Sequence, residues 1–133
     1  MNDLPHSTPC PCGLPLRYSH CCARYHAGVN RGESAPDPEA LMRSRYSAYV
    51  LNLADYLQAT WHASTRPSLL TPGEPGLQWL GLEVKATSQQ DATHGTVSFV
   101  ARSKLHGRAN RMTETSRFVL EDGRWLYVDG ERD

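Results

Sequence analysis

The chain has 133 residues, enough for one ordinary domain with at most a small appendage. Fourteen acidic and fourteen basic residues balance, so the average electrostatic field attracts neither DNA nor an anionic membrane. No apolar run approaches the roughly eighteen residues of a membrane span, and the opening MNDLPHSTPC lacks the features of a signal peptide. We therefore expect a cytoplasmic protein.

All four cysteines lie in one short segment, CPCGLPLRYSHCC, and the rest of the chain has none. One residue separates Cys10 from Cys12, and eight residues separate Cys12 from the adjacent pair Cys21 and Cys22. A reducing cytoplasm disfavours structural disulfides, and clustered cysteines there more often bind a metal. Because four thiolates are a preferred ligand set for a closed tetrahedral zinc site, we expect zinc here.

Several alternatives for this segment are open at the level of sequence. The cysteines could form disulfides, including a vicinal Cys21–Cys22 bond, or could be ordinary buried thiols. Iron also suits thiolate ligands, although it is the lesser expectation. A neighbouring histidine could replace one cysteine: His6, His20 or His26. Four thiolates on a divalent ion leave a negative centre, which Arg17 and Arg24 could offset.

The pattern CPCG, then tyrosine, then Cys-Cys resembles the SEC-C motif, the zinc-binding tail at the C-terminus of the SecA translocase. The resemblance implies four metal ligands: Cys10, Cys12, Cys21 and Cys22. Tyr18 matches the aromatic position of the motif. The usual motif has Ser-Gly-Lys after the glycine, whereas this chain has LPL at residues 14–16. We expect the metal site to survive this change, but the resemblance does not imply partner binding through the missing lysine.

The resemblance continues beyond the cysteines. Four segments are similar to the YchJ-like family: CCARYHAG, ALMRSRYSAYV, DYLQATWH and GRWLYVDG. That family joins an N-terminal SEC-C motif to a nuclear-transport-factor-2-like domain. The resemblance implies a metal-binding lobe over residues 1–29, a linker over 30–37 and an α+β domain over 38–133. Composition agrees with the linker, because NRGESAPDP is rich in turn-forming residues.

Helical signals begin after this linker. Asp37 precedes Pro38, which predicts an N-cap followed by proline at the first helical position. Apolar residues then recur at helical spacing and predict a buried stripe: Met42, Tyr46, Tyr49, Val50 and Leu53. The segment LADYLQATWH predicts a second helical piece with Leu53, Leu57 and Trp61 on one side. Three prolines and two glycines predict a loop over STRPSLLTPGEPG.

Four segments of alternating apolar residues follow and predict strands. LGLEVKA places four residues on one face: Leu80, Leu82, Val84 and Ala86. The later segments group Val97, Phe99 and Ala101, then Met112, Glu114, Ser116, Phe118 and Leu120, and finally Trp125 and Tyr127. Helices followed by antiparallel strands predict an α+β fold with the helices on one face of a curved sheet. Such a sheet forms a cone whose mouth can hold a small molecule.

Glu114 is anomalous, because its strand places it on the inward face with Met112 and Phe118. A buried carboxylate needs a partner or takes up a proton. The candidate partners are Arg43, Arg45 and His62. A pair such as His62 and Glu114 could perform acid–base catalysis, or an ion pair could simply fix helix against sheet. The candidate pocket residues are Arg43, Tyr46, Trp61, His62, Glu114 and Trp125.

Other chemical signals are few. The sequence has no glycine-rich phosphate loop, nucleophile elbow or paired metal carboxylates. The positive run RSKLHGRANR is most simply explained as a solvated hairpin turn. The more specific alternative is a weak contact with RNA or the ribosome.

Two function hypotheses follow. In the first, which we favour from sequence, the protein is a zinc-binding adapter. The SecA resemblance then implies a protein partner in export or at the ribosome. In the second, the cone binds a small molecule or acts as a cyclase-, isomerase- or dehydratase-type enzyme, an inference that rests on fold analogy.

Overall fold

The computed structural model describes residues 8–28, 34–68, 70 and 75–132. The helical elements are the 3₁₀ helix η1 (Tyr18–His20), α1 (Cys22–Gly28), α2 (Pro38–Leu51) and α3 (Ala54–Ala59). The strands are β1 (Leu77–Asp91), β2 (His94–Leu105), β3 (Arg108–Glu121) and β4 (Arg124–Arg132). The strands form one antiparallel sheet in the order β1-β2-β3-β4, which confirms the predicted α+β fold.

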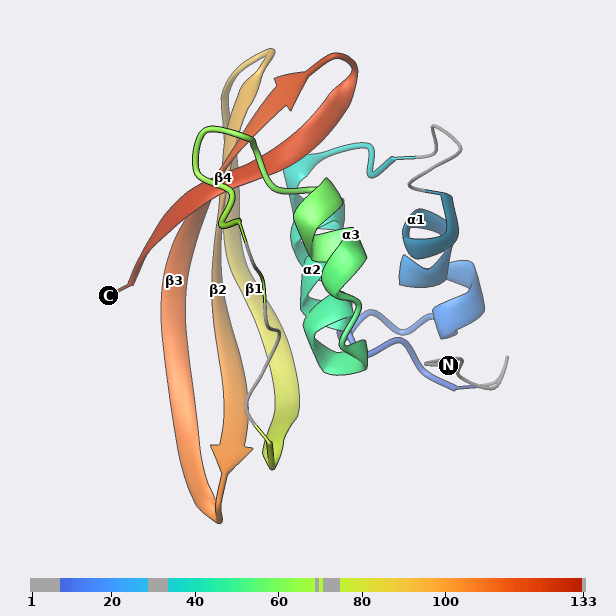
Figure 1. Ribbon diagram of the computed structural model, residues 1–133, viewed down its shortest axis with the longest axis vertical. Coiled ribbons are helices and arrows are strands. Elements are labelled where there is room, and N and C mark those ends of the chain that lie inside the picture. The colour runs from blue at the N-terminus through green and yellow to red at the C-terminus, as the bar shows by residue number, and fades with distance from the viewer. Residues whose placement is uncertain (1–7, 29–33, 69, 71–74, 133) are drawn as a thin grey trace.

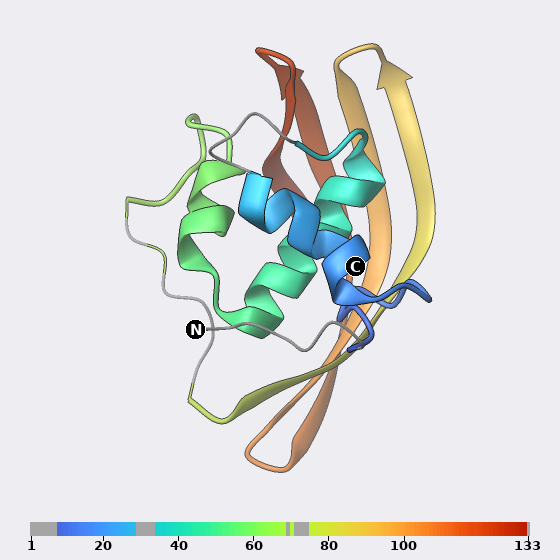
Figure 2. The ribbon, with the colours of Figure 1, turned by 90° about the vertical axis from the view of Figure 1, so that its right-hand side faces the viewer.

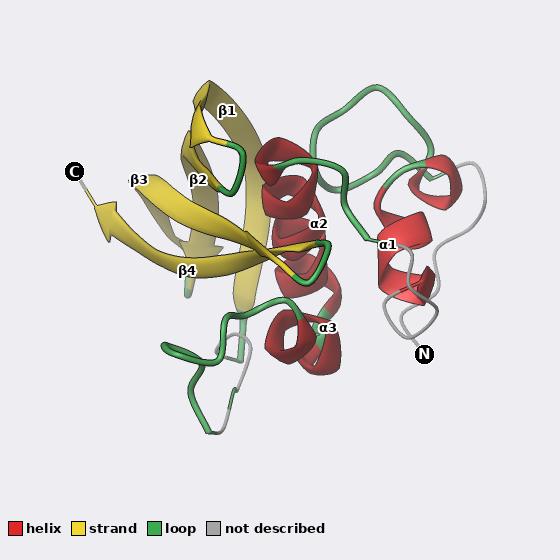
Figure 3. Ribbon diagram, turned by 90° about the horizontal axis from the view of Figure 1, so that it is seen from above, coloured by secondary structure: helices red, strands yellow, loops and turns green. Residues whose placement is uncertain are grey.

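The elements are arranged in three layers (Figures 1 and 3). The curved sheet is one outer layer, α2 and α3 form the middle layer, and the N-terminal segment with α1 forms the other outer layer. None of the helices in the described ranges is long and apolar enough to cross a membrane. Some sequence predictions lie outside the described residues: His6, residues 30–33 of the linker, and residues 69 and 71–74 of the loop.

The start of α2 follows the predicted capping pattern. The Asp37 side chain accepts a hydrogen bond from the backbone N–H of Ala40 at 2.8 Å, and Pro38 opens the helix. The helix ends at Leu51, where Asn52 takes a left-handed conformation with φ of 58°. Leu53, the last residue of the predicted stripe, therefore lies beyond the end of the helix.

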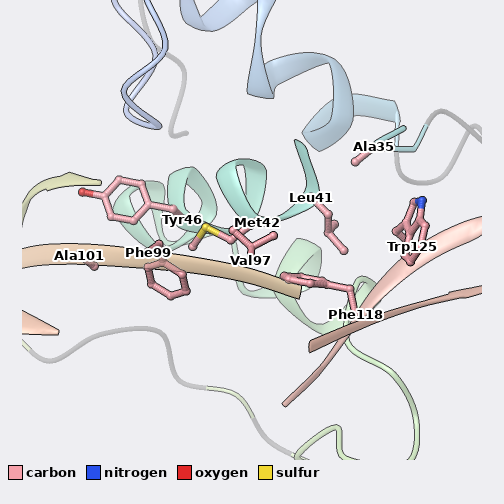
Figure 4. Close-up of a cluster of buried hydrophobic side chains, with 9 residues drawn as sticks. All are labelled: Ala35, Leu41, Met42, Tyr46, Val97, Phe99, Ala101, Phe118 and Trp125. Carbon is pink, nitrogen blue, oxygen red and sulfur yellow. The ribbon is translucent and has the colours of Figure 1, made fainter. Parts of the chain in front are cut away.

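The main core lies between α2 and the inner face of the sheet (Figure 4). Met42 and Tyr46 of α2 pack there with Phe99 and Phe118 of the strands. Val97, Phe99 and Ala101 are all buried, as their alternation predicted. Burying these apolar side chains is the main source of stability for the helix–sheet contact.

The opposite side of α2 is buried as well. Ser44, Ser47 and Ala48 are each 0% exposed, although the apolar stripe predicted only one buried face. Figure 2 shows α1 in front of α2, on the side away from the sheet. Ser47 lies 3.7 Å from the Cys10 Sγ of the lobe, whereas Ser44 and Ala48 contact Tyr56 of α3. The sheet therefore covers one side of α2, and the lobe and α3 cover the rest.

The prediction for β1 is partly wrong. Leu80 is 57% exposed, whereas Leu82 and Val84 pack against the core with Trp79. The pairing of β1 with β2 shifts register between Trp79 and Gly81. An extra residue at such a bulge reverses the alternation of the strand, so Trp79 takes the inward position expected for Leu80. A second shift, between Val84 and Ala86, accompanies the exposure of Ala86.

The segment after α3 joins the sheet instead of continuing as a helix. α3 ends at Ala59, and Trp61 forms an isolated parallel bridge with Tyr127 of β4. The N–H of His62 donates to the Tyr127 carbonyl, and the N–H of Tyr127 donates to the Thr60 carbonyl, both at 2.8 Å. These bonds fix Trp61 at the wall of the cone.

Candidate metal centre and cone cavity

The four cysteine sulfurs converge on one point in the lobe. All four side chains are buried, and their Sγ atoms lie within 4.8 Å of one another. The Sγ atoms of Cys12 and Cys21 are 3.6 Å apart, and all four cysteines are free thiols. A tetrahedral zinc ion with Zn–S distances of about 2.3 Å requires sulfurs about 3.8 Å apart. The donor set therefore fits one tetrahedral metal ion.

The electrostatics of the cluster also fit a cation. Hydrogen bonds from the Cys12 and Cys22 thiols lower the pKa of Cys10 strongly. The pKa of Cys22 is raised, first by its hydrogen bond to Cys10, because that bond requires Cys22 to keep its proton. Burial raises the pKa of Cys21 to about 12. The four thiols cannot all lose their protons unless a bound cation offsets the accumulated negative charge.

The loop between the cysteines requires a glycine. Gly13 has φ of 92°, a conformation that side-chain-bearing residues rarely adopt. A Cβ at this position would also lie 3.1 Å from the Leu82 carbonyl oxygen of β1. Gly13 thus lets the chain turn between the cysteines and approach the backbone of the sheet closely.

Arginines hold the backbone around the cysteines. Arg43 of α2 donates from Nη1 to the Cys12 carbonyl at 2.7 Å and pairs with Glu39 at 2.9 Å. Arg24 donates to the Cys21 carbonyl at 3.2 Å. The prediction that Arg43 lines the pocket or pairs with Glu114 is wrong, because its side chain extends to the lobe side of α2.

His26 of α1 joins the lobe to α2. Its Nε2 lies 2.8 Å from the Ser44 carbonyl, and its Nδ1 lies 2.7 Å from the Tyr18 hydroxyl. A carbonyl only accepts, so Nε2 carries the proton and Nδ1 accepts from Tyr18. The ring also packs edge-on against Tyr56, with centroids 4.6 Å apart. Both ring nitrogens are occupied, and only cysteines form the ligand cluster among the described residues.

A cavity of about 360 Å³ lies between α2 and the inner face of the sheet. Its walls are largely aromatic: Tyr46, Tyr49, Trp61, Trp79, Phe99, Phe118 and Tyr127. Three charged residues also line it: Arg45, Glu114 and Arg132. The Arg132 side chain is 74% exposed and marks the mouth, whereas Arg45 is only 5% exposed. The predicted cone therefore contains a cavity with a buried cation.

Arg45 is held in place by neutral groups. Its Nη1 donates to the Leu57 carbonyl at 2.9 Å and to the Thr60 hydroxyl at 2.7 Å. Its Cζ lies 5.1 Å from the ring centroid of Trp61 and 4.6 Å from that of Tyr127. Desolvation by burial lowers the pKa of the guanidinium, and the neighbouring tyrosines oppose that shift.

Glu114 has partners other than those predicted. Its Oε1 lies 3.7 Å from Nε of Arg132, and its Oε2 accepts a hydrogen bond from the Ser116 hydroxyl at 2.9 Å. Gly130 of β4 leaves room for this carboxylate, because a Cβ there would overlap it. Burial, followed by the Glu114 charge, raises the pKa of Tyr127 to about 12, so that hydroxyl stays protonated at neutral pH.

The structure separates His62 from Glu114. His62 Nε2 lies 2.7 Å from Glu121 Oε2, its Nδ1 accepts from the Ser64 N–H, and the ring is not part of the cavity wall. The candidate His62–Glu114 pair is therefore not formed. Trp125 is also placed elsewhere, because it is buried in the core at 6% exposure.

Tyr46, Trp61 and Glu114 do line the cavity. Sequence reasoning considered Arg45 only as a partner for Glu114 and did not place Trp79 or Arg132 in the pocket. The position of Arg45 could have been suspected, since it is next to Tyr46 of the predicted buried stripe. The inward position of Trp79 could not have been predicted, because it depends on the bulge in β1.

A second hollow adjoins this cavity along the sheet. It has a volume of about 760 Å³ and shares Trp79, Ala101, Met112 and Arg132 with the cavity. Its outer part is lined by His106 and Arg108, which belong to the positive run noted in the sequence. The aromatic cavity therefore opens toward a basic rim.

The fold and the two sites define a class of protein: a cone-shaped α+β domain that carries a four-cysteine metal-binding lobe. The family model described as "YchJ, middle NTF2-like domain" matches residues 37–130. The chain belongs to this YchJ-like family.

Curated relatives match nearly the whole chain. A UPF0225 protein of Bordetella parapertussis is 57% identical over 129 residues, covering 96% of each chain. A UPF0225 protein of Methylibium petroleiphilum is 56% identical over 132 residues, covering 98% of this chain and 94% of that one. These relatives therefore match both the lobe and the cone domain of this chain.

Two solved structures have the same fold. The solution structure of RPA3114, a SEC-C motif containing protein from Rhodopseudomonas palustris, has a TM-score of 0.78 and 34% identity, covering 92% of this chain and 96% of that one. The crystal structure of a SEC-C motif containing protein from Psychrobacter arcticus has a TM-score of 0.77 and 29% identity, with coverage of 93% and 82%. These likenesses agree with the SEC-C motif recognised in the sequence.

Proposed function

We propose that this protein is a zinc-stabilised small-molecule-binding protein whose ligand site is the cone cavity. The observation that carries this proposal is the aromatic cavity that holds Arg45 and Glu114 in its wall. Ligand sites are typically concave, mostly apolar and furnished with a few fixed polar groups, and about 360 Å³ falls within their usual range. Because of this cavity, we now favour the small-molecule-binding hypothesis over the adapter hypothesis that we favoured from sequence.

Zinc has a structural role in this proposal. The four thiolates complete a tetrahedral set and leave no position for a substrate, as in closed structural zinc sites. The names of the two solved relatives, both SEC-C motif containing proteins, support the same assignment. A reducing compartment such as the cytoplasm would keep the thiols available. The bound ion would hold the lobe against α2, which carries Arg45 on its other side.

The proposal is tested by filling the cavity. Ala101 lies in the cavity wall and is 3% exposed, so Ala101→Leu should reduce the binding of small aromatic probes. Ala86→Leu is the matched control, because Ala86 is exposed on β1 and outside the wall. Ligand-observed NMR with 2-naphthoate and its neutral amide reports binding, and circular dichroism checks that both variants fold. Equal binding to both variants, or no binding of either probe to the wild type, would contradict the proposal.

A second candidate is a protein contact through the lobe. Leu16 is 45% exposed and lies in the segment that departs from the usual polar SEC-C sequence. Leu16 offers one apolar contact point in place of the usual polar residue, and the SEC-C resemblance suggests a partner in export or at the ribosome. Co-sedimentation of the zinc-loaded protein with purified ribosomes, compared with Leu16→Ser, tests this candidate. Equal sedimentation of both proteins would count against it.

Acid–base catalysis by His62 and Glu114 is not part of the proposal. His62 forms its short contact with Glu121 instead, and the two candidate residues do not share the cavity.

A further inference from the structure

Arg45 carries a charge that its surroundings do not balance. It is 5% exposed, and the acceptors bonded to its Nη1 are a backbone carbonyl and a hydroxyl. No Asp or Glu in the described part of the chain lies within ion-pair distance of it. A buried cation is costly unless an anion compensates it, and none of the described residues supplies one within ion-pair distance.

The other charges in the cavity do not change this conclusion. Glu114 is the one carboxylate among the described lining residues, and Arg132 and Ser116 already contact its two oxygens. Arg132 sits at the exposed mouth, and its contact with the mostly buried Glu114 offsets the negative charge of that carboxylate. Arg45 is therefore the buried lining cation that forms no ion pair with a described carboxylate, and an anionic group entering the cavity could pair with it.

The walls around Arg45 select a flat, apolar body. Trp61 packs edge-on against Tyr127, with ring centroids 5.0 Å apart, and Tyr127 contacts Phe118 at 5.9 Å. On the other side, Tyr46 meets Trp79 edge-on at 5.6 Å. Aromatic rings held this way offer faces and edges to a further ring, and a guanidinium fork matches the two oxygens of a carboxylate.

We infer that the ligand of the cone cavity is a small aromatic carboxylic acid, with its carboxylate on Arg45 and its ring among these aromatic side chains. This inference rests on the proposed function, because it names the chemical class of ligand for the same cavity. The Tyr127 hydroxyl lies in the same wall and can donate a further hydrogen bond, since its raised pKa keeps it protonated.

The test compares an acid with its neutral isostere on the zinc-loaded, full-length protein. Isothermal titration calorimetry measures the Kd of 2-naphthoate and of 2-naphthamide. The charge-assisted pair should make the acid bind at least about tenfold more tightly than the amide. Raising the salt concentration should weaken the binding of 2-naphthoate and leave the binding of 2-naphthamide unchanged. This comparison needs no mutation, so it holds even if an Arg45 variant fails to fold.

Two arginine variants locate the carboxylate. Arg45→Met removes the buried charge and should abolish the preference for the acid. Arg132→Met is the matched control, since it removes the other cavity arginine at the exposed rim, and it should preserve most of the preference. Glu114→Gln should leave the acid affinity unchanged or raise it, because it removes a negative charge from the same cavity.

The outcomes distinguish the two proposals. Equal affinity for acid and amide, with both blocked by Ala101→Leu, would overturn the carboxylate inference and retain the ligand cavity. A preference that is lost in Arg132→Met and kept in Arg45→Met would overturn the placement on Arg45. Failure of both probes to bind at all would overturn both proposals.

Discussion

His26→Phe tests whether the lobe and the cone domain unfold as one unit. The substitution keeps an aromatic ring near Tyr56 but removes the hydrogen bonds to Tyr18 and to the Ser44 carbonyl. A buried hydrogen bond contributes about 0.5–1.5 kcal/mol net, so the two together imply a loss of about 2 kcal/mol. With a urea m-value of about 2 kcal/mol/M for a chain of this size, the unfolding midpoint should fall by about 1 M.

Tryptophan fluorescence during urea titration is the appropriate assay. All three tryptophans, Trp61, Trp79 and Trp125, belong to the cone domain, so their signal reports its unfolding and not that of the lobe. His26→Gln is the matched control, because its amide can still donate to Ser44 and should recover part of the loss. A fluorescence transition unchanged by His26→Phe would refute the reasoning and show that the cone domain has an independent core.

The remaining predictions concern metal, pH and charge. Protein purified under reducing conditions should contain about one zinc ion per chain by elemental analysis, and Cys12→Ser should lose it; a metal-free wild type would contradict the site. Burial lowers the pKa of His26 below its usual 6.5, so the unfolded chain binds the extra proton and the free energy of unfolding should fall as the pH drops below about 6.5. Urea titrations should show a weaker pH dependence in His26→Gln, and identical slopes would count against this coupling. Glu114→Gln should cost less than about 1 kcal/mol, because its partner arginine is mostly exposed, and a loss of several kcal/mol would mean that the carboxylate anchors the fold. His62→Ala should leave the binding of 2-naphthoate unchanged by calorimetry, since its ring lies outside the cavity, and a large loss would restore it as a site residue.

The metal site was predictable because its signal is local in the sequence. Cys10, Cys12, Cys21 and Cys22 lie close together along the chain, and spacing alone brings such ligands into one loop. The cap of α2 at Asp37 and the faces of β2 and β3 were predictable for the same reason. Short-range geometry determines a helix cap and the alternation of a regular strand.

Features that depend on long-range packing were not predictable. The exposure of Leu80 follows from a bulge that cannot be recognised from the residue types in this segment. Arg43 and Arg45 are two positions apart on one helix, yet Arg43 bonds to the lobe and Arg45 enters the cavity. Only the positions of the lobe and the sheet on opposite sides of α2 decide which arginine meets which partner. Glu114 was correctly placed on the inward face, but its partner came from the end of β4.

The most direct test of the ligand cavity follows the three indole N–H signals in an NMR titration. Trp61 and Trp79 line the cavity, whereas Trp125 is buried in the core outside its wall and is an internal reference. Adding 2-naphthoate to the zinc-loaded protein should shift the signals of Trp61 and Trp79 and leave that of Trp125 in place. A titration in which Trp125 shifts as much as the other two, or in which none of the three responds, would contradict a ligand site in the cone.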